Sequence, residues 1–107
     1  MRCFNLREQA RTLRSHRDLE EKGYVMEVIH RQGGMRLVLV VLSPGGVIPR
    51  HVAPGDITIH VLEGDVTVRR EEAAWQLVEG ELVALRAGEP HAVGSGTGGA
   101  FLLTINA

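Results

Sequence analysis

The spacing of hydrophobic positions changes near Gly23. Before this residue, apolar side chains recur at helical spacing after Asn5, which is a candidate N-cap. After it, short runs of β-branched and apolar residues alternate with glycine-containing turns. The pattern predicts a short helix over about residues 5–15 and an all-β region over about residues 24–107.

Two segments of the β region have clear strand patterns. Residues 37–42 are apolar without interruption, which predicts a strand buried on both faces. Residues 57–61 alternate, so Ile57 and Ile59 are expected to point to the same, inner face. The segment 63–65, Glu-Gly-Asp, predicts a turn. Further strands are expected at 24–30, 66–68, 75–77, 82–85 and 101–105.

The size and charge of the chain narrow the classes of function. Its 107 residues correspond to a single domain, residues 1–107. Twelve basic and thirteen acidic side chains leave a net charge of -1. Because proteins that bind nucleic acid are usually basic, we expect no nucleic-acid partner.

The distribution of apolar residues and cysteine bears on location. The uncharged, largely apolar stretch over residues 37–49 is too short to span a bilayer and is interrupted by a Pro-Gly-Gly sequence. The N-terminus has no apolar segment typical of a secretory signal. A single cysteine, Cys3, allows no internal disulfide. We therefore expect a cytoplasmic protein that does not associate with membranes.

Arginines form a second helical stripe before Gly23. Arg7, Arg11 and Arg14 repeat at helical spacing, and we interpret them as a solvated face, with contact to an anionic ligand as the alternative. Arg50 is likewise expected on the surface, with attraction of an anion to the mouth of a barrel as its alternative role.

Glycines and histidines of the β region resemble the two short motifs of the cupin family. The first group is Gly45, His51 and Gly64, and the second is Gly80, Gly88 and His91. The resemblance covers about residues 35–105. It implies a jelly-roll β-barrel with one open mouth, preceded here by the short helix, and a dimer.

The resemblance also implies a metal site, from which this sequence departs. Cupin metal sites usually take two histidines and a glutamate from the first motif and one histidine from the second. His51 and His91 stand at two of those positions, whereas Ala53 and Ile57 replace the other histidine and the glutamate. Two neutral imidazoles hold a divalent ion weakly, since a tight site usually needs three or four protein ligands. The cofactor stays open at this point: either His51 and His91 coordinate a weakly bound divalent transition metal, or they bond to neighbouring groups or to a ligand without a metal.

Other side chains are considered as a third ligand. Strand alternation directs His60 outward if Ile57 points inward. Asp56 has the same outward parity but lies near a turn and could bend inward. Glu27 and His30 lie on a different strand, and the sequence does not place their side chains.

We rank three functions. The first is a small-molecule-binding module with an apolar barrel pocket, lined by His51, Ile57, Ile59 and His91. The second is a metal-dependent cupin enzyme of the dioxygenase or isomerase type that uses His51 and His91. The third is a regulatory or structural dimerisation domain, a scaffold that would be favoured by a barrel filled with its own side chains. Whether the protein is an enzyme stays open at this point.

The expected partners are a small-molecule ligand and a second copy of the chain. The outward-facing residues Thr58, His60 and Leu62 form a candidate surface for a homodimer.

Overall fold

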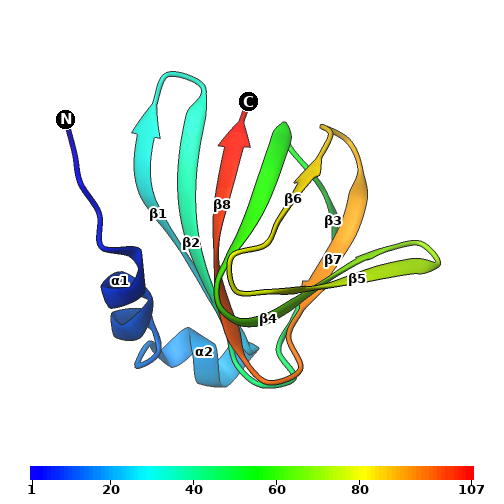
Figure 1. Cartoon of the computed structure of the whole chain (residues 1–107), viewed down its shortest axis with the longest axis horizontal. Helices are drawn as coiled ribbons and strands as arrows, with labels where there is room; N and C mark the ends of the chain where they lie inside the picture. The colour runs from blue at the N-terminus through cyan, green and yellow to red at the C-terminus, as the bar shows by residue number, and fades with distance from the viewer.

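The computed structural model describes all residues, 1–107. Two short helices precede eight antiparallel strands (Figure 1). The helices are α1 (Leu6–Leu13) and α2 (Arg17–Lys22). The strands are β1 (Tyr24–Gln32), β2 (Met35–Leu42), β3 (Val47–Val52), β4 (Asp56–Arg70), β5 (Ala73–Val78), β6 (Leu82–Leu85), β7 (Pro90–Gly94) and β8 (Gly99–Asn106). Neither helix has the length and hydrophobicity that a membrane crossing requires.

The strands form one curled antiparallel sheet. The strand order is β1-β2-β8-β4-β7-β3, and β5 and β6 also pair with β4. Figure 1 shows the strong curvature of the sheet, with the helices outside it on the side of β1 and β2. The all-β, jelly-roll class predicted from the sequence is confirmed, and the β region begins at Tyr24.

The long strand β4 corrects one prediction. The segment 63–65 is not a turn, because β4 continues through it. This strand pairs with β8 up to Val61 and again from Glu63, and the register shifts between these two residues. Gly64 adopts a positive φ of +68° that bends the strand, and a Cβ at this position would lie only 2.0 Å from the Gly98 carbonyl oxygen. Gly64 therefore permits a bend within a strand. The local sequence of such a bend does not differ from that of a hairpin turn.

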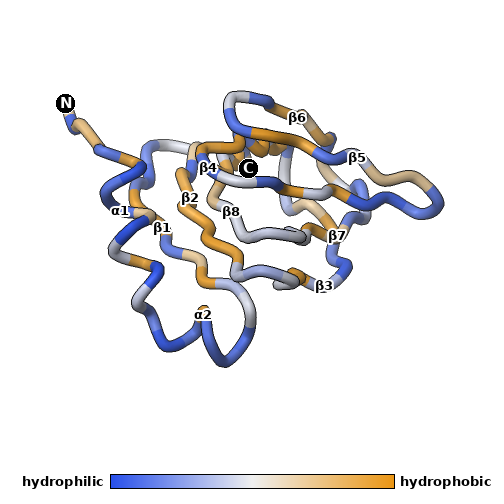
Figure 2. Tube along the Cα trace, turned by 60° about the horizontal axis from the view of Figure 1, so that its bottom comes forward, coloured by the Kyte–Doolittle hydropathy of each residue, from blue (hydrophilic) through white to orange (hydrophobic).

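Two hydrophobic clusters lie on opposite faces of β2. Val40 and Leu42 belong to a cluster of 14 buried residues inside the barrel. Leu39 and Val41 belong to a cluster of 6 buried residues between the sheet and α1. Figure 2 shows β2 as hydrophobic along its path. The predicted burial of this strand on both faces is confirmed, because the N-terminal helix covers its outer face.

The N-terminal segment contains two helices where one was predicted. The Asn5 side chain accepts a hydrogen bond from the backbone N–H of Glu8 at 3.0 Å, as expected of an N-cap. The first helix then ends at Leu13 rather than near residue 15. A second N-cap follows, since the His16 ring accepts a hydrogen bond from the N–H of Asp18 at 3.0 Å and begins α2.

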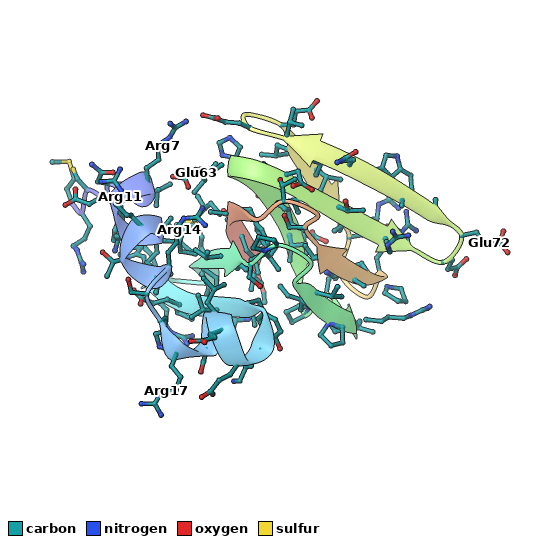
Figure 3. The ribbon with its side chains drawn as sticks, turned by 90° about the horizontal axis from the view of Figure 1, so that it is seen from below. Arg7, Arg11, Arg14, Arg17, Glu63 and Glu72 are labelled. Atoms are coloured by element: carbon teal, nitrogen blue, oxygen red, sulfur yellow. The ribbon has the colours of Figure 1, made fainter.

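The arginine stripe of α1 lies at the surface and contacts the barrel (Figure 3). Arg14 forms an ion pair with Glu63 of β4 at 2.8 Å. Arg7 forms another with Glu79, in the turn after β5. Because all four side chains are partly exposed, these pairs contribute little stability and mainly orient the helix.

A buried carboxylate holds the loop between β7 and β8. Asp65 of β4 accepts hydrogen bonds from the Ser95 hydroxyl at 3.2 Å and from the N–H groups of Gly96 and Thr97 at 3.0 and 2.9 Å. The Thr97 hydroxyl donates another to the same carboxylate. These bonds, led by that of the Thr97 hydroxyl, hold the pKa of Asp65 well below its usual range.

We predict that Asp65→Asn lowers the free energy of unfolding by about 3 kcal/mol near neutral pH, since an amide cannot accept all of these bonds. The carboxyl has a lower pKa folded than unfolded, where it is about 3.9. The ionised carboxyl therefore stabilises the fold fully at pH values above its unfolded-state pKa. This stabilisation is lost as the pH falls from the unfolded-state pKa toward the folded-state pKa. Urea titrations across this acid range should show a steeper loss of stability for the wild type than for the variant.

A matched control is Asp56→Asn, because Asp56 is exposed and accepts one hydrogen bond, from the N–H of Ala87 at 2.9 Å. It should cost no more than about 1 kcal/mol. Equal losses in the two variants would contradict the assigned role of Asp65.

Candidate functional site

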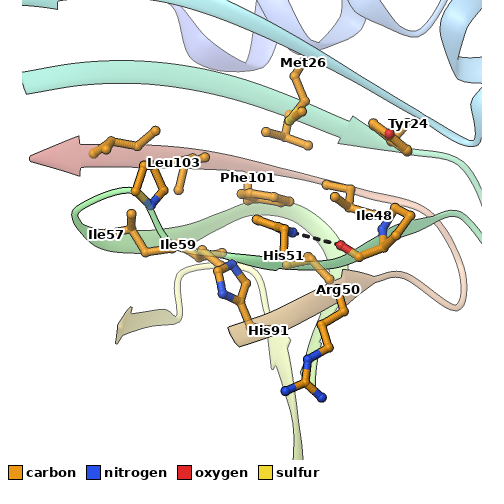
Figure 4. A pocket seen from close by; sticks show the side chains of 15 residues that line it. Tyr24, Met26, Ile48, Arg50, His51, Ile57, Ile59, His91, Phe101 and Leu103 are labelled. Carbon is orange, nitrogen blue, oxygen red and sulfur yellow. Dashed lines mark hydrogen bonds between the residues drawn. The ribbon is translucent and has the colours of Figure 1, made fainter. Parts of the chain in front are cut away.

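Pairing of β3 with β7 brings the two predicted site histidines together. His51 and His91 lie opposite each other in the register of the two strands, with ring centroids 4.3 Å apart. The two side chains differ in depth, because His91 is only 2% exposed whereas His51 is exposed at the mouth of the barrel. Figure 4 shows the adjacent rings at one end of a pocket.

An irregularity in β3 allows His51 to face the interior. Ile48 pairs with Val93 and His51 with His91, so β3 advances three residues while β7 advances two. With regular alternation, Ile48 and Arg50 would share a face and His51 would point away. The extra residue, next to Pro49, reverses this alternation as a β-bulge does.

Backbone carbonyls fix the proton on each ring. Nδ1 of His51 lies 2.8 Å from the carbonyl oxygen of Pro49, and Nδ1 of His91 lies 3.0 Å from that of Glu89. Since a carbonyl oxygen only accepts, each Nδ1 carries a hydrogen and donates it. In the neutral rings, Nε2 then keeps its lone pair and has no partner within the protein.

The environment of His91 favours its neutral form. Burial lowers the pKa of His91 below its ordinary value, and the neighbouring charge of His51 lowers it further. The hydrogen bond to the Glu89 carbonyl acts in the opposite direction but does not outweigh burial. The deeper ring is therefore a hydrogen-bond acceptor at neutral pH.

A largely apolar cavity of about 310 Å³ adjoins the histidines. Ile57 and Ile59 of β4 line it, and both are almost fully buried, at 4% and 1% exposure. The structure thus places all four predicted site residues around one space. The remaining lining residues are Tyr24, Met26, Val40, Ile48, Pro49, Arg50, Pro54, Val93, Phe101, Leu103 and Ile105.

Sequence reasoning missed the walls that other strands supply. Tyr24 and Met26 come from β1, and Phe101 and Leu103 come from β8. No local signal identifies these positions, because their approach to the histidines depends on the strand order. Arg50 lies at the rim, and Figure 4 shows its guanidinium directed away from the pocket.

The candidate third metal ligands do not join the histidines. Asp56 bonds to the backbone of Ala87, and His30 bonds to the Gln32 side chain at 3.2 Å. Glu27 is exposed and His60 is partly buried, and neither lines the cavity. Nowhere do three histidine, cysteine, aspartate or glutamate side chains converge as a metal site. The residues present do not complete the cupin metal site.

Comparison with known proteins identifies the family. Residues 38–105 match the cupin domain, so the chain belongs to the cupin family. The structure is similar to an RmlC-like cupin protein from Desulfovibrio desulfuricans, with 26% identity, coverage of 99% of this chain and 96% of that chain, and a TM-score of 0.81.

Two other solved structures agree. TT1209 from Thermus thermophilus is 28% identical, with coverage of 99% and 97% of the two chains and a TM-score of 0.80. A cupin-2 domain containing protein from Shewanella frigidimarina is 15% identical, with coverage of 97% and 94% and a TM-score of 0.78, which shows a shared fold. No curated protein matches the sequence.

We predict that His91 titrates below about 6.5, the value for an unstructured imidazole. Nitrogen NMR of the imidazoles during an acid titration measures this pKa and also identifies the Nδ1-protonated tautomer. As the pH falls, the unfolded state binds a proton at this histidine at a higher pH than the folded state does. Protonation of His91 therefore lowers the stability of the fold as the pH falls below about 6.5. A His91 pKa above 6.5, or a proton on Nε2 of the neutral ring, would contradict the geometry.

Proposed function

We propose that this cupin binds a small molecule in its barrel and does so without a resident metal. The observation that carries the proposal is the combination of an apolar cavity with two unpartnered imidazole nitrogens at one end. Binding sites for small molecules commonly pair apolar walls with a few fixed polar groups. The open space in the barrel also argues against a scaffold filled by its own side chains.

The hydrophobic walls favour a ligand that is mostly apolar. Phe101 and Ile59 are almost fully buried in the barrel core and form part of the cavity surface. Transfer of an apolar ligand from water onto these walls is favourable by about 25 cal/mol for each Å² buried. The histidines then select the ligand's orientation, since they are the polar pair at one end of this surface.

A metal-dependent enzyme of the dioxygenase or isomerase type is the second candidate. It is favoured by the hydrogen bonds from both Nδ1 atoms to backbone carbonyls, since metal-binding histidines are usually oriented in this way. A substrate or water molecules would have to supply the remaining ligands. We rank this candidate second because Ile57 lines the cavity where the family usually has a glutamate.

Metal analysis distinguishes the two candidates. We predict that the untagged protein, dialysed after incubation with zinc or iron, retains far less than one metal ion per chain by elemental mass spectrometry. The double variant His51→Ala, His91→Ala should retain equally little. A matched control is His30→Ala, His60→Ala, which removes two histidines outside the cavity.

Retention of about one metal ion per chain, lost only in the His51 and His91 variant, would reverse the ranking. A thermal-shift screen on the metal-free protein then tests binding directly. We expect small apolar compounds to raise the melting temperature of the wild type and to have a smaller effect on the cavity double variant.

We also propose a homodimer. Of the surface expected from the sequence, Leu62 is partly buried against the cluster under α1 and therefore offers less area to a partner. His60 lies opposite Leu82 of β6 in the register, so the two side chains share a face, and Leu82 is 55% exposed. This exposed apolar residue beside Thr58 and His60 supports a contact between copies.

We predict a dimeric mass in light scattering at micromolar concentration and a shift toward monomer in Leu82→Glu, which places a charge in the contact. The matched control is Val47→Glu on β3, because Val47 is similarly exposed, at 54%. A monomeric wild type would refute the dimer, and dissociation by both variants would refute this choice of surface.

A further inference from the structure

The buried ring of His91 presents an acceptor to the cavity. Its Nδ1 is bonded to the Glu89 carbonyl, and its Nε2 has no partner in the protein. The only buried side-chain nitrogen or oxygen that lacks both a hydrogen-bond partner and contact with open space is Oε1 of Gln9, on α1. Nε2 of His91 therefore contacts open space, and His91 is one of the residues that line the cavity.

A neutral imidazole in this tautomer discriminates between ligand groups. Its Nε2 attracts a hydroxyl hydrogen and opposes an ether or carboxylate oxygen, which would place lone pair against lone pair. The exposed Nε2 of His51 can hydrogen-bond to water when a ligand is bound. The buried ring of His91 loses access to water when an apolar ligand enters the cavity. A ligand without a donor therefore leaves a buried acceptor unsatisfied.

No other group inside the cavity compensates a negative charge. Besides the two histidines, the polar side chains that line it are Tyr24 and Arg50. Arg50 is exposed at the rim and points away from the histidines in Figure 4. An anion beside His91 would be desolvated among apolar side chains without a cation, which is strongly unfavourable.

The volume of the cavity suits a small ligand. A cavity of about 310 Å³ corresponds to about ten water molecules at about 30 Å³ each. A molecule with one aromatic ring and a short substituent, about ten non-hydrogen atoms, fits within this space. Phe101 provides an aromatic surface in the wall against which such a ring can pack.

We infer that the ligand is an uncharged, single-ring hydroxyl compound of the phenol class, whose hydroxyl donates a hydrogen bond to Nε2 of His91. The inference rests on the proposed metal-free binding function and specifies its ligand class. Carboxylates and ethers of the same size and shape are disfavoured at this position.

Calorimetric titration with three matched probes tests the inference. The probes are para-ethylphenol, para-ethylanisole and para-ethylbenzoate, which present a hydroxyl, a methyl ether and a carboxylate on the same ring. The protein is first treated with a chelator to remove metal, and the titrations are run at about pH 8. At this pH the phenol is uncharged, because phenolic groups titrate near 10. We expect the phenol to bind at least about tenfold more tightly than either other probe.

The variant His91→Phe keeps an aromatic ring but removes the acceptor. It should weaken the binding of para-ethylphenol about tenfold and abolish the preference for the phenol over the ether. His30→Phe is the matched control, because His30 lies outside the cavity and the change should preserve that preference. Nitrogen NMR of the wild type gives a readout that needs no variant: the Nε2 resonance of His91 should move on addition of the phenol and not of the ether.

The outcomes separate this inference from the proposed function. Equal binding of phenol and ether, both reduced by His51→Ala, would overturn the hydroxyl assignment and leave the binding function standing. Absence of binding by all three probes would overturn the hydroxyl assignment, while binding of unrelated apolar compounds in the thermal-shift screen would still support the function. Preference for the carboxylate would overturn the inference, and a requirement for added zinc would also favour the metal enzyme.

Discussion

The barrel depends on one strand that belongs to both of its walls. The first half of β4 pairs with β8 and β6, and the second half pairs with β5 and β7. A strand of this length closes a barrel only if it bends, and Gly64 provides the bend where the register with β8 shifts. Asp65, the next residue, holds the loop before β8 at the same place. The backbone geometry at two adjacent residues thus sets the relative position of Ile57 and the two histidines.

The bulge in β3 has the corresponding role at the site itself. It allows Ile48 and His51 to line the same cavity although their spacing is wrong for regular alternation. Pro49 lies in the irregular segment, has no N–H to donate to a strand ladder, and offers its carbonyl to the His51 ring. The feature that interrupts the pairing therefore also orients the side chain. Positioning of a polar group by a local defect is consistent with the tendency of bulges to lie near functional sites.

Much of the fold could be predicted because its signals are local. Alternation at 57–61 placed Ile57 and Ile59 inward, and the apolar run at 37–42 indicated burial on both faces. Other features depend on partners remote in sequence. The segment 63–65 has the composition of a turn, and only its pairing with β8 keeps it within a strand. Similarly, the cavity walls from β1 and β8 and the proton positions on the rings follow from strand order and carbonyl placement, which a linear sequence does not contain.

The walls of the cavity differ in how firmly the fold holds them. Strands β4, β7 and β8 are each paired on both sides, whereas β1 is an edge strand that pairs only with β2. Tyr24 and Met26 contribute to the cavity from this edge, and Met26 is 51% exposed. Substitution at Met26 can reshape the cavity without disturbing the barrel core. Evolution or protein engineering can therefore change the shape of the cavity along β1 while its histidine end stays constant.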